Sequence, residues 1–171
     1  SRITGAENPD LFVMSYSKEE MKVDNLFLVP KHFFVPEIIE KRKPLAETAR
    51  RAGWTGCNIL IDKIPPQGKI DIIKGRTEVS RKEISEKLGI SDRLIVKDIK
   101  ARGWLLDILN CVNSIKTNEF TLDDVYAFTS LLTEKHPNNN NIQPKIRQQL
   151  QFLRDKGVIE FTGKGRYRKL I

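Results

Sequence analysis

The sequence contains little that could form disulfides, bind zinc or enter a membrane. Its 171 residues include only two cysteines, Cys57 and Cys111, which lie far apart and belong to no CxxC motif. Such spacing excludes a disulfide framework and a zinc site, so we expect both cysteines to be reduced and buried in the core. No stretch approaches the roughly 18 apolar residues of a membrane-spanning helix, and the first residues lack a secretory signal. We therefore expect a cytoplasmic protein without a membrane partner.

Catalytic motifs are also scarce. His32 and His136 are isolated, and no GxSxG motif occurs. The strongest candidate is NPDLFVMSYSKEEMK at residues 8–22, where Asp10 and Glu20 resemble the acidic pair of metal-dependent nucleases. If residues 11–16 form a strand followed by a turn, the two carboxylates lie roughly 18 Å apart, too far to share one metal ion. We therefore predict no catalytic residue and no metal site in this chain.

Positive charge, in contrast, is abundant and unevenly distributed. Thirty lysines and arginines oppose 22 aspartates and glutamates, which gives a net charge of +8. Residues 141–171 contain eight of the basic residues and only two acidic ones, a net charge of +6. A basic surface of this kind favours an acidic partner, and nucleic acid is the leading candidate.

Residues 1 to about 76 have the pattern of a mixed α/β piece with several short strands. Apolar runs at residues 11–16 and 26–29, with polar residues between them, indicate a β-hairpin. Residues 58–61 and 69–74 flank a turn-rich segment and indicate a second pair of strands.

Two helices are predicted before residue 100. Residues 44–52 have Pro44 in the first turn and Gly53 directly after the last one. The second predicted helix covers residues 78–89, and Gly89 ends it.

Residues 101–171 have the pattern of three helices followed by a β-hairpin. Apolar residues recur at helical spacing from Trp104 onward, and Thr121 is placed to cap a second helix through the amide of Asp124. The third helix is predicted at residues 141–156, with one apolar stripe along it. This order of elements predicts a winged helix-turn-helix domain.

The predicted third helix has the features of a recognition helix. The face opposite its apolar stripe carries Pro144, Lys145, Gln148 and Gln151, with Arg147 at the edge. Glutamine can form two hydrogen bonds with adenine, and lysine can reach guanine or a phosphate. The following ribbon, residues 159–170, is the predicted wing, and its basic side chains are Lys164, Arg166, Arg168 and Lys169.

Four blocks of the sequence together resemble one known family. They are KPLAETARRAGWTGCNI, ARGWLLDILNCVNSI, EFTLDDVY and KIRQQLQFLRDKGVIEFTGKGRYRKL, which occur in this order. They are similar to the DpnI-like, Dam-replacing family of methyl-directed restriction endonucleases. The resemblance covers nearly the whole chain from about residue 2, with a divergent stretch at residues 66–100.

The resemblance implies a fold, an activity and a cofactor. Members of the family have a PD-(D/E)xK nuclease domain with a four-cysteine zinc site, then a winged helix, and recognise adenine-methylated GATC. This chain has neither the zinc cysteines nor the strands with the catalytic acids, so we expect an α+β protein of two domains. Residues 1–100 would be the C-terminal part of the nuclease domain, and residues 101–171 the winged helix. Mg²⁺ is expected in the full-length parent enzyme but not in this chain, which we expect to be inactive.

The resemblance also adds residues of the first domain to the predicted DNA-binding set. It implies that Trp54, in the string RAGW, contacts the methylated adenine, and an aromatic face can cover such a methyl group. Arg50 and Arg51 could neutralise phosphates. The complete predicted set is Trp54, Arg50, Arg51, Lys145, Arg147, Gln148, Gln151, Lys164, Arg166 and Arg168.

Three functions remain open at the level of sequence. The first is the DNA-binding part of a type II methyl-directed restriction endonuclease, acting on double-stranded DNA as a monomer. The second is a stand-alone winged-helix transcriptional regulator, whose N-terminal part dimerises or senses a ligand. The third is a basic module that binds another protein, which a DNA-binding assay at moderate salt would exclude or support.

Overall fold

The computed structural model describes residues 9–170 and divides the chain into two compact units. The units are Ser1–Ile84 and Ser85–Ile171, and both combine helices with strands, as expected for the predicted α+β class. The predicted boundary after residue 100 stays a prediction. Helix α1 (Arg81–Arg93) begins in the first unit and continues into the second.

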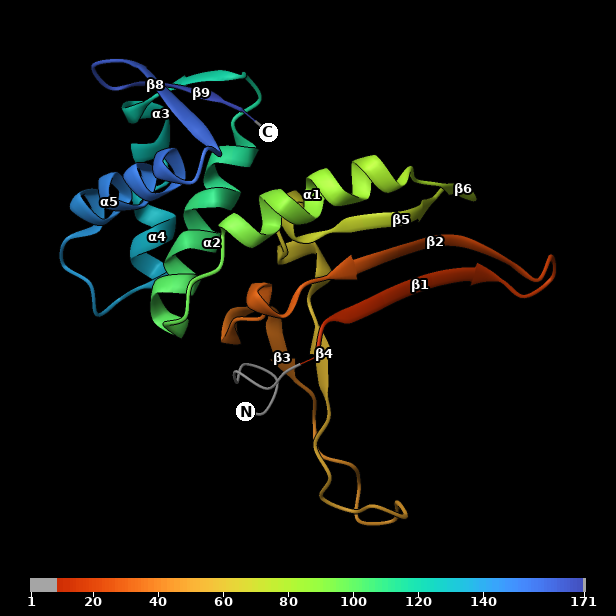
Figure 1. Ribbon diagram of the computed structural model, residues 1–171. Coiled ribbons are helices and arrows are strands. Elements are labelled where there is room, and N and C mark those ends of the chain that lie inside the picture. The colour runs from red at the N-terminus through yellow and green to blue at the C-terminus, as the bar shows by residue number, and fades with distance from the viewer. Residues whose placement is uncertain (1–8, 171) are drawn as a thin grey trace. The chain divides into compact units, whose positions relative to one another are not determined.

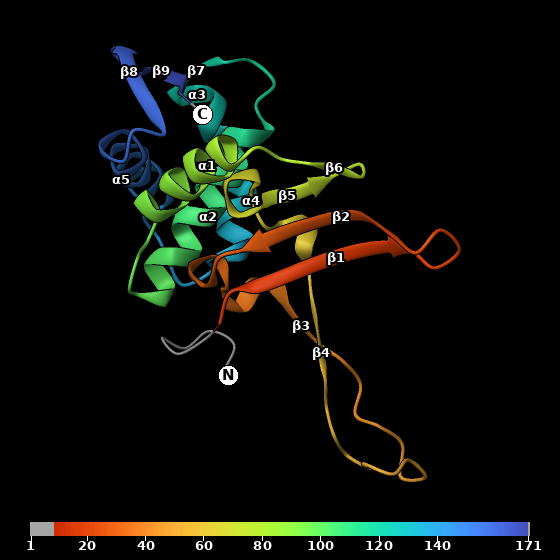
Figure 2. The ribbon, with the colours of Figure 1, turned by 45° about the vertical axis from the view of Figure 1, so that its right-hand side comes forward.

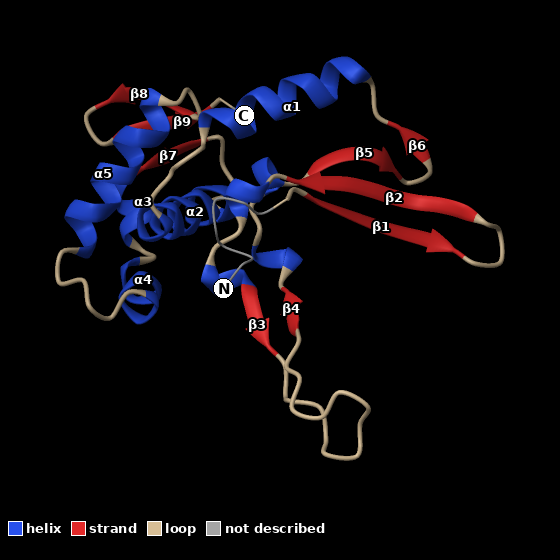
Figure 3. Ribbon diagram, turned by 60° about the horizontal axis from the view of Figure 1, so that its bottom comes forward, coloured by secondary structure: helices blue, strands red, loops and turns tan. Residues whose placement is uncertain are grey.

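The first unit contains an antiparallel sheet in the order β1-β2-β5-β6 (Figure 3). The four strands are β1 (Leu11–Ser17), β2 (Lys22–Val29), β5 (Ile70–Lys74) and β6 (Thr77–Glu78). The predicted hairpin is confirmed, but its turn is shorter than predicted, because the polar start of β2 pairs with the end of β1 through a bulge after Ser15. Backbone pairing thus extends the strands through a stretch whose side chains are polar.

The second predicted strand pair is wrong in its pairing, although both strands exist. Strand β4 (Cys57–Ile59) pairs with β3 (Ile39–Lys41), whereas β5 pairs with β2 and β6. Two 3₁₀ turns, Ile61–Lys63 and Pro66–Gly68, lead the chain from one sheet to the other. The two prolines before Gln67 favour such a redirection, because they remove backbone donors from any continuing ladder.

The segment between β3 and β4 is a long exposed arm, which we call the β3–β4 arm (residues 39–59), and not the predicted helix (Figures 1 and 2). The Leu45 amide donates to the Trp54 carbonyl at 2.9 Å, and the Gly53 amide donates to the Leu45 carbonyl at 3.1 Å. Gly53 has φ +76°, a conformation that glycine adopts without strain. A helix of nine residues has no stability of its own in water, and this segment buries no apolar face that could stabilise one.

The core of the first unit is small and consists of strand ends in β2 and β5 and of the turns next to them. Its buried side chains include Val29, Phe33, Phe34, Ile64 and Ile70. A Cβ atom at Gly68 would lie 2.6 Å from the Phe33 ring, so the backbone there must be glycine for the ring to pack against it.

The second unit is helical with a three-stranded sheet. Its helices after α1 are α2 (Ile99–Ser114), α3 (Leu122–Tyr126), α4 (Thr129–Lys135) and α5 (Ile142–Asp155). The sheet has the order β7-β9-β8, from β7 (Glu119–Thr121), β8 (Ile159–Gly163) and β9 (Arg166–Lys169). None of the described helices is both long and apolar enough to cross a bilayer.

Two helix boundaries differ from the prediction for identifiable reasons. Helix α1 starts at Arg81, where the Ser80 hydroxyl accepts a hydrogen bond from the Glu83 amide, and it continues through Gly89. The capping box of Thr121 with Asp124 is confirmed, but the helix that it starts ends at Tyr126. The Thr129 hydroxyl donates to the Tyr126 carbonyl at 2.6 Å, which gives this carbonyl a partner outside a continuous helix.

The apolar stripe of α5 forms the centre of the second core, as predicted. Ile146, Leu150 and Leu153 are fully buried, and Ile142 is 8% exposed. The prediction that both cysteines are buried is confirmed for Cys111 and wrong for Cys57. Cys57 is exposed on β4, because the arm has no core of its own.

Candidate DNA-binding surfaces

The outward face of α5 carries the side chains predicted for base recognition. Pro144, Gln148 and Gln151 are exposed, and Lys145 is half-buried. Pro144, Lys145 and Gln148 line a pocket at the start of the helix together with Asn139 and Asn141. The run of asparagines before α5 therefore contributes to this surface, a role that the sequence did not indicate.

Lys145 is held in place by two neighbours. Its Nζ donates a hydrogen bond to Gln148 Oε1 at 2.8 Å. The same ammonium lies 6.0 Å from the centroid of the Trp104 ring, within the range of a cation–π contact. The positive charge on this face is thus fixed relative to the glutamine beside it.

Trp104 is itself part of a buried polar cluster. Its ring stacks on His136 with 3.7 Å between centroids and 15° between planes. Asp107, which is 7% exposed, binds His136 Nε2 at 2.9 Å and also accepts a hydrogen bond from Lys135. This cluster connects α2 with the end of α4. Sequence reasoning missed it, since Trp104 has the spacing of a core residue and His136 is isolated in the sequence.

Arg147 lies at the edge of the same face and has a partner within the unit. Its guanidinium donates to the Tyr126 hydroxyl at 2.5 Å. A phosphate contact by Arg147 would have to share or replace this hydrogen bond.

The wing presents two exposed basic side chains at its turn. Lys164 and Arg166 flank Gly165, whose φ of +67° allows the tight connection between β8 and β9. Both side chains are exposed, so they can reach a phosphate without rearrangement of the hairpin. Tyr167, next to Arg166, points the other way and packs against Phe120 with 5.2 Å between ring centroids.

Arg168 is in a different situation from the other basic residues of the wing. Its guanidinium donates to Glu119 Oε1 and to Glu160 Oε1, each at 2.8 Å. The hydrogen bond with Glu119 is the main reason why its pKa is raised above the ordinary value. The predicted phosphate contact of Arg168 stays a prediction, and it would compete with these two carboxylates.

The β3–β4 arm places the other predicted DNA-binding residues in water. Trp54 is 54% exposed, and Arg50 and Arg51 are exposed beside it. A Cβ atom at Gly56 would lie 2.9 Å from Cη2 of Trp54, so the indole lies directly over the backbone of this glycine. Glycine at this position therefore lets the ring lie flat along the arm.

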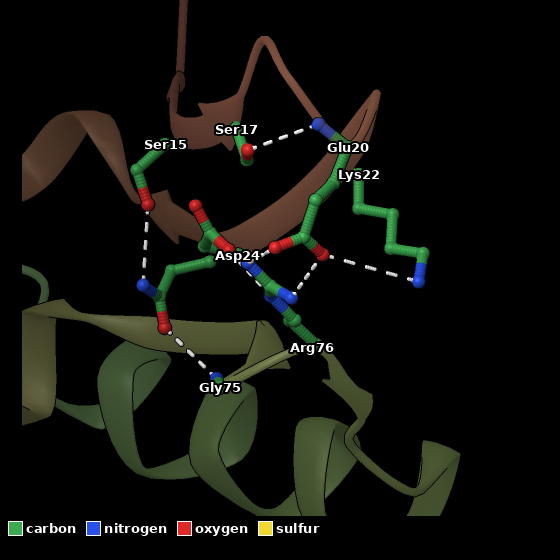
Figure 4. Close-up of polar contacts among 8 residues, drawn as sticks. Ser15, Ser17, Glu20, Lys22, Asp24, Gly75 and Arg76 are labelled. Carbon is green, nitrogen blue, oxygen red and sulfur yellow. Dashed lines mark hydrogen bonds and ion pairs between the residues drawn. The ribbon is translucent and has the colours of Figure 1, made fainter.

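Asp10 and Glu20 lie at opposite ends of β1 and are engaged in separate contacts. Asp10 Oδ1 accepts a hydrogen bond from the Lys31 amide at 2.8 Å. Glu20, in the β1–β2 turn, accepts from Arg76 at 2.5 Å, and Arg76 also binds Asp24 at 2.7 Å (Figure 4). Among residues 9–170, no group of three His, Cys, Asp or Glu side chains could hold a metal ion.

Arg76 therefore joins the β1–β2 turn to the turn between β5 and β6, and this contact gives Glu20 a structural role. Asn25 adds to the connection, because its side chain accepts from the Gly75 amide at 2.9 Å and donates to the Ser15 hydroxyl. Arg76 adopts φ +69°, an uncommon conformation for a residue with a side chain. Its contacts with both turns hold it there.

Two protein-family models match the chain. One, named DpnI and described as the Dam-replacing family, matches residues 1–96. The other, named DpnI_C and described as the Dam-replacing HTH domain, matches residues 100–169. The first match covers more than half of the chain and includes the β3–β4 arm, while the second contains α5 and the hairpin of β8 and β9.

Proposed function

We propose, from the premise that this chain belongs to the DpnI Dam-replacing family, that it is the DNA-binding part of a type II methyl-directed restriction endonuclease. Its partner is double-stranded DNA, and the site that it recognises is adenine-methylated GATC. The observation that supports this most is the outward face of α5, where Lys145 and Gln148 line a pocket within the matched helix-turn-helix domain. Such residues at the start of a recognition helix are placed to reach base edges in the major groove.

Positioning on the duplex is the task of the exposed basic side chains. Lys164 and Arg166 in the wing contact phosphates, as do Arg50 and Arg51 on the β3–β4 arm. Phosphate contacts fix the register of a protein on DNA without reading its sequence. This division assigns affinity to the wing and the arm, and base recognition to α5.

Trp54, in the first unit, contributes its own contact with methylated adenine. Methylation adds an apolar group to the exocyclic nitrogen of adenine in the major groove, and an aromatic face can cover it. The exposure of Trp54 on an arm supports this role, because a core tryptophan would have to leave its packing to reach DNA.

The hydrolytic step is not assigned to residues of this chain. Mg²⁺ acts in the full-length enzyme, where it requires carboxylates that converge on one ion. Asp10 and Glu20 do not fit this requirement, since each lies at a different end of β1 with its own partner. We further propose that the protein is monomeric and acts in the cytoplasm.

Binding of this chain to three otherwise identical duplexes tests the proposal. Their single GATC is unmethylated, methylated on one strand, or methylated on both, and a fourth duplex with a scrambled site measures non-specific binding. We expect affinity to increase with each methyl group. Equal affinity for all four duplexes would contradict the proposal, and preference for an unmethylated sequence would instead support a winged-helix regulator.

A further inference from the structure

We propose that Lys145 determines specificity by occupying the carbonyl oxygen of Gln148, so that α5 does not favour unmethylated adenine. This inference rests on the proposed function, because it concerns how the same helix discriminates between the two bases. It assigns to Lys145 a role that neither a phosphate contact nor a guanine contact would give it.

The contact with the Trp104 ring restricts the positions that the Lys145 side chain can take. The indole is only 7% exposed, and it is stacked on His136, which is bound to the buried Asp107. This arrangement fixes the orientation of the ring, and the ammonium of Lys145 lies 6.0 Å from its centroid. A lysine in contact with a fixed aromatic face has fewer directions available than a lysine that extends freely into water.

The same ammonium donates a hydrogen bond to Gln148 Oε1 at 2.8 Å. Glutamine recognises unmethylated adenine with both ends: its oxygen accepts from N6 and its nitrogen donates to N7. Lys145 uses one lone pair of this oxygen and places its positive charge beside it, which weakens the oxygen as an acceptor for the partly positive N6 hydrogen. Bidentate recognition of unmethylated adenine is therefore weaker while the hydrogen bond with Lys145 is in place.

Methylated adenine lacks the hydrogen that this oxygen would accept. One N6 hydrogen pairs with thymine, and the methyl group replaces the other in the major groove. A glutamine oxygen directed at the methyl group would lose its hydrogen bond with water and gain none. Lys145 satisfies this oxygen in advance, and the exposed Pro144 in the same pocket offers an apolar surface for the methyl group.

Lys145→Met tests the inference, because it keeps the apolar stem and removes the donor and the charge. The measurement is the ratio of affinities for fully methylated and unmethylated GATC duplexes. We expect this ratio to fall by roughly five- to tenfold, since the Gln148 oxygen then accepts from unmethylated adenine without a cation beside it. In a Gln148→Ala background the same substitution should leave the ratio unchanged.

Lys156→Met is the matched control, at the residue that directly follows α5. Lys156 also lies over an aromatic ring, at 5.2 Å from the Phe152 centroid, but it has no glutamine as partner among the contacts described. It should lower the affinity for both duplexes by the same factor and leave their ratio intact. Trp104→Phe, with its folding checked by thermal unfolding, gives an independent test, because a smaller ring holds the ammonium less firmly and should lower the ratio in the same direction.

The outcomes separate this inference from the proposed function. If the unaltered chain shows no preference for methylated DNA, both are wrong. The second case is that the unaltered chain shows the preference, but Lys145→Met lowers its affinity for both duplexes by the same factor, as Lys156→Met does. Lys145 is then only a phosphate contact, and the inference alone is overturned.

Discussion

Single side chains on the DNA-binding surfaces should have separable effects on binding. Gln148→Ala removes a side chain placed to contact a base edge, so we expect a loss of roughly 1–3 kcal/mol for the cognate duplex and little change for a scrambled one. Competition binding with the two duplexes measures this. A uniform loss on both, or no loss on either, would mean that another element reads the bases.

Substitutions in the wing should affect binding differently from Gln148→Ala. Lys164→Ala and Arg166→Ala remove exposed cations at the hairpin turn, and phosphate contacts carry no base information. The affinities for methylated, unmethylated and scrambled duplexes should therefore fall together, by a similar factor. A selective loss on the methylated duplex would instead give the wing a part in base recognition.

Cys111 should make stability depend on pH in the alkaline range. Burial raises the pKa of its thiol from 9.0 to about 11, with Asp107 as the second cause. Between these values the unfolded chain loses the proton while the folded chain keeps it. The free energy of unfolding should therefore fall by roughly 2–3 kcal/mol as the pH rises through this window, and the contribution is fully present below pH 9.

Urea unfolding of the unaltered chain and of Cys111→Ala, at pH 8 and above pH 10, isolates this contribution. Other groups titrate equally in both proteins, so the stability difference between them should shrink as the pH rises. A difference that stays constant would show that the thiol ionises normally in the folded state.

At the scale of elements, the start of α3 depends on its capping box. The Thr121 hydroxyl accepts from the Asp124 amide, while the Asp124 carboxylate accepts from the Thr121 amide at 2.7 Å. Thr121→Ala should lower the free energy of unfolding by about 1 kcal/mol. The same contacts lower the pKa of Asp124, so its contribution is present at neutral pH and is lost in acid.

Thr133→Ala is a suitable control for this measurement. Its hydroxyl bonds to the Thr129 carbonyl within α4, which caps nothing, so the change should stay within about 0.5 kcal/mol. Equal losses in the two variants would indicate that the box does not stabilise α3.

The periodic elements could be predicted from sequence, and the arm could not. In α5 the helical spacing of Ile146, Leu150 and Leu153 predicts that these side chains are buried. The core face and the outward face of the helix could therefore both be predicted from this spacing. In the β3–β4 arm Pro44 and Gly53 are compatible with either a helix or a turn. What decides between them is the absence of a core beneath the segment, and that depends on the tertiary structure.

In the candidate site, too, some features could be predicted from the sequence and others could not. Exposure of Gln148 and Lys164 follows from local periodicity and turn chemistry. The neighbours of Arg168 and Lys145 do not, because Glu119 and Trp104 are distant in sequence and approach only through folding. Sequence therefore predicted which side chains face outward but not which of them are already engaged.

At the scale of the whole molecule, the net charge of +8 should make DNA binding strongly dependent on salt. Each neutralised phosphate releases counterions and contributes about −0.9 to the slope of log K against log salt. Titrations at several salt concentrations should give a steep negative slope, and Lys164→Ala should reduce its magnitude by about 1. An affinity unchanged between low and moderate salt would exclude phosphate contacts as the main source of binding.

The whole chain should also leave methylated GATC DNA intact in the presence of Mg²⁺. Asp10 and Glu20 are the only carboxylates that the sequence suggested for a shared metal, and their contacts lie at opposite ends of β1. Incubation with a methylated plasmid, followed by electrophoresis, measures cleavage. Specific cutting that Asp10→Ala abolishes would show that these carboxylates do meet.

The two tryptophans give each unit its own fluorescent reporter. Trp54 is 54% exposed on the β3–β4 arm, whereas Trp104 is 7% exposed in the second unit. Indole emission moves to longer wavelength in a polar environment, so the spectrum of the chain is the sum of a red component from the arm and a blue one from the helical core. External quenchers such as iodide reach only the first, which makes the two units distinguishable in one cuvette without any label.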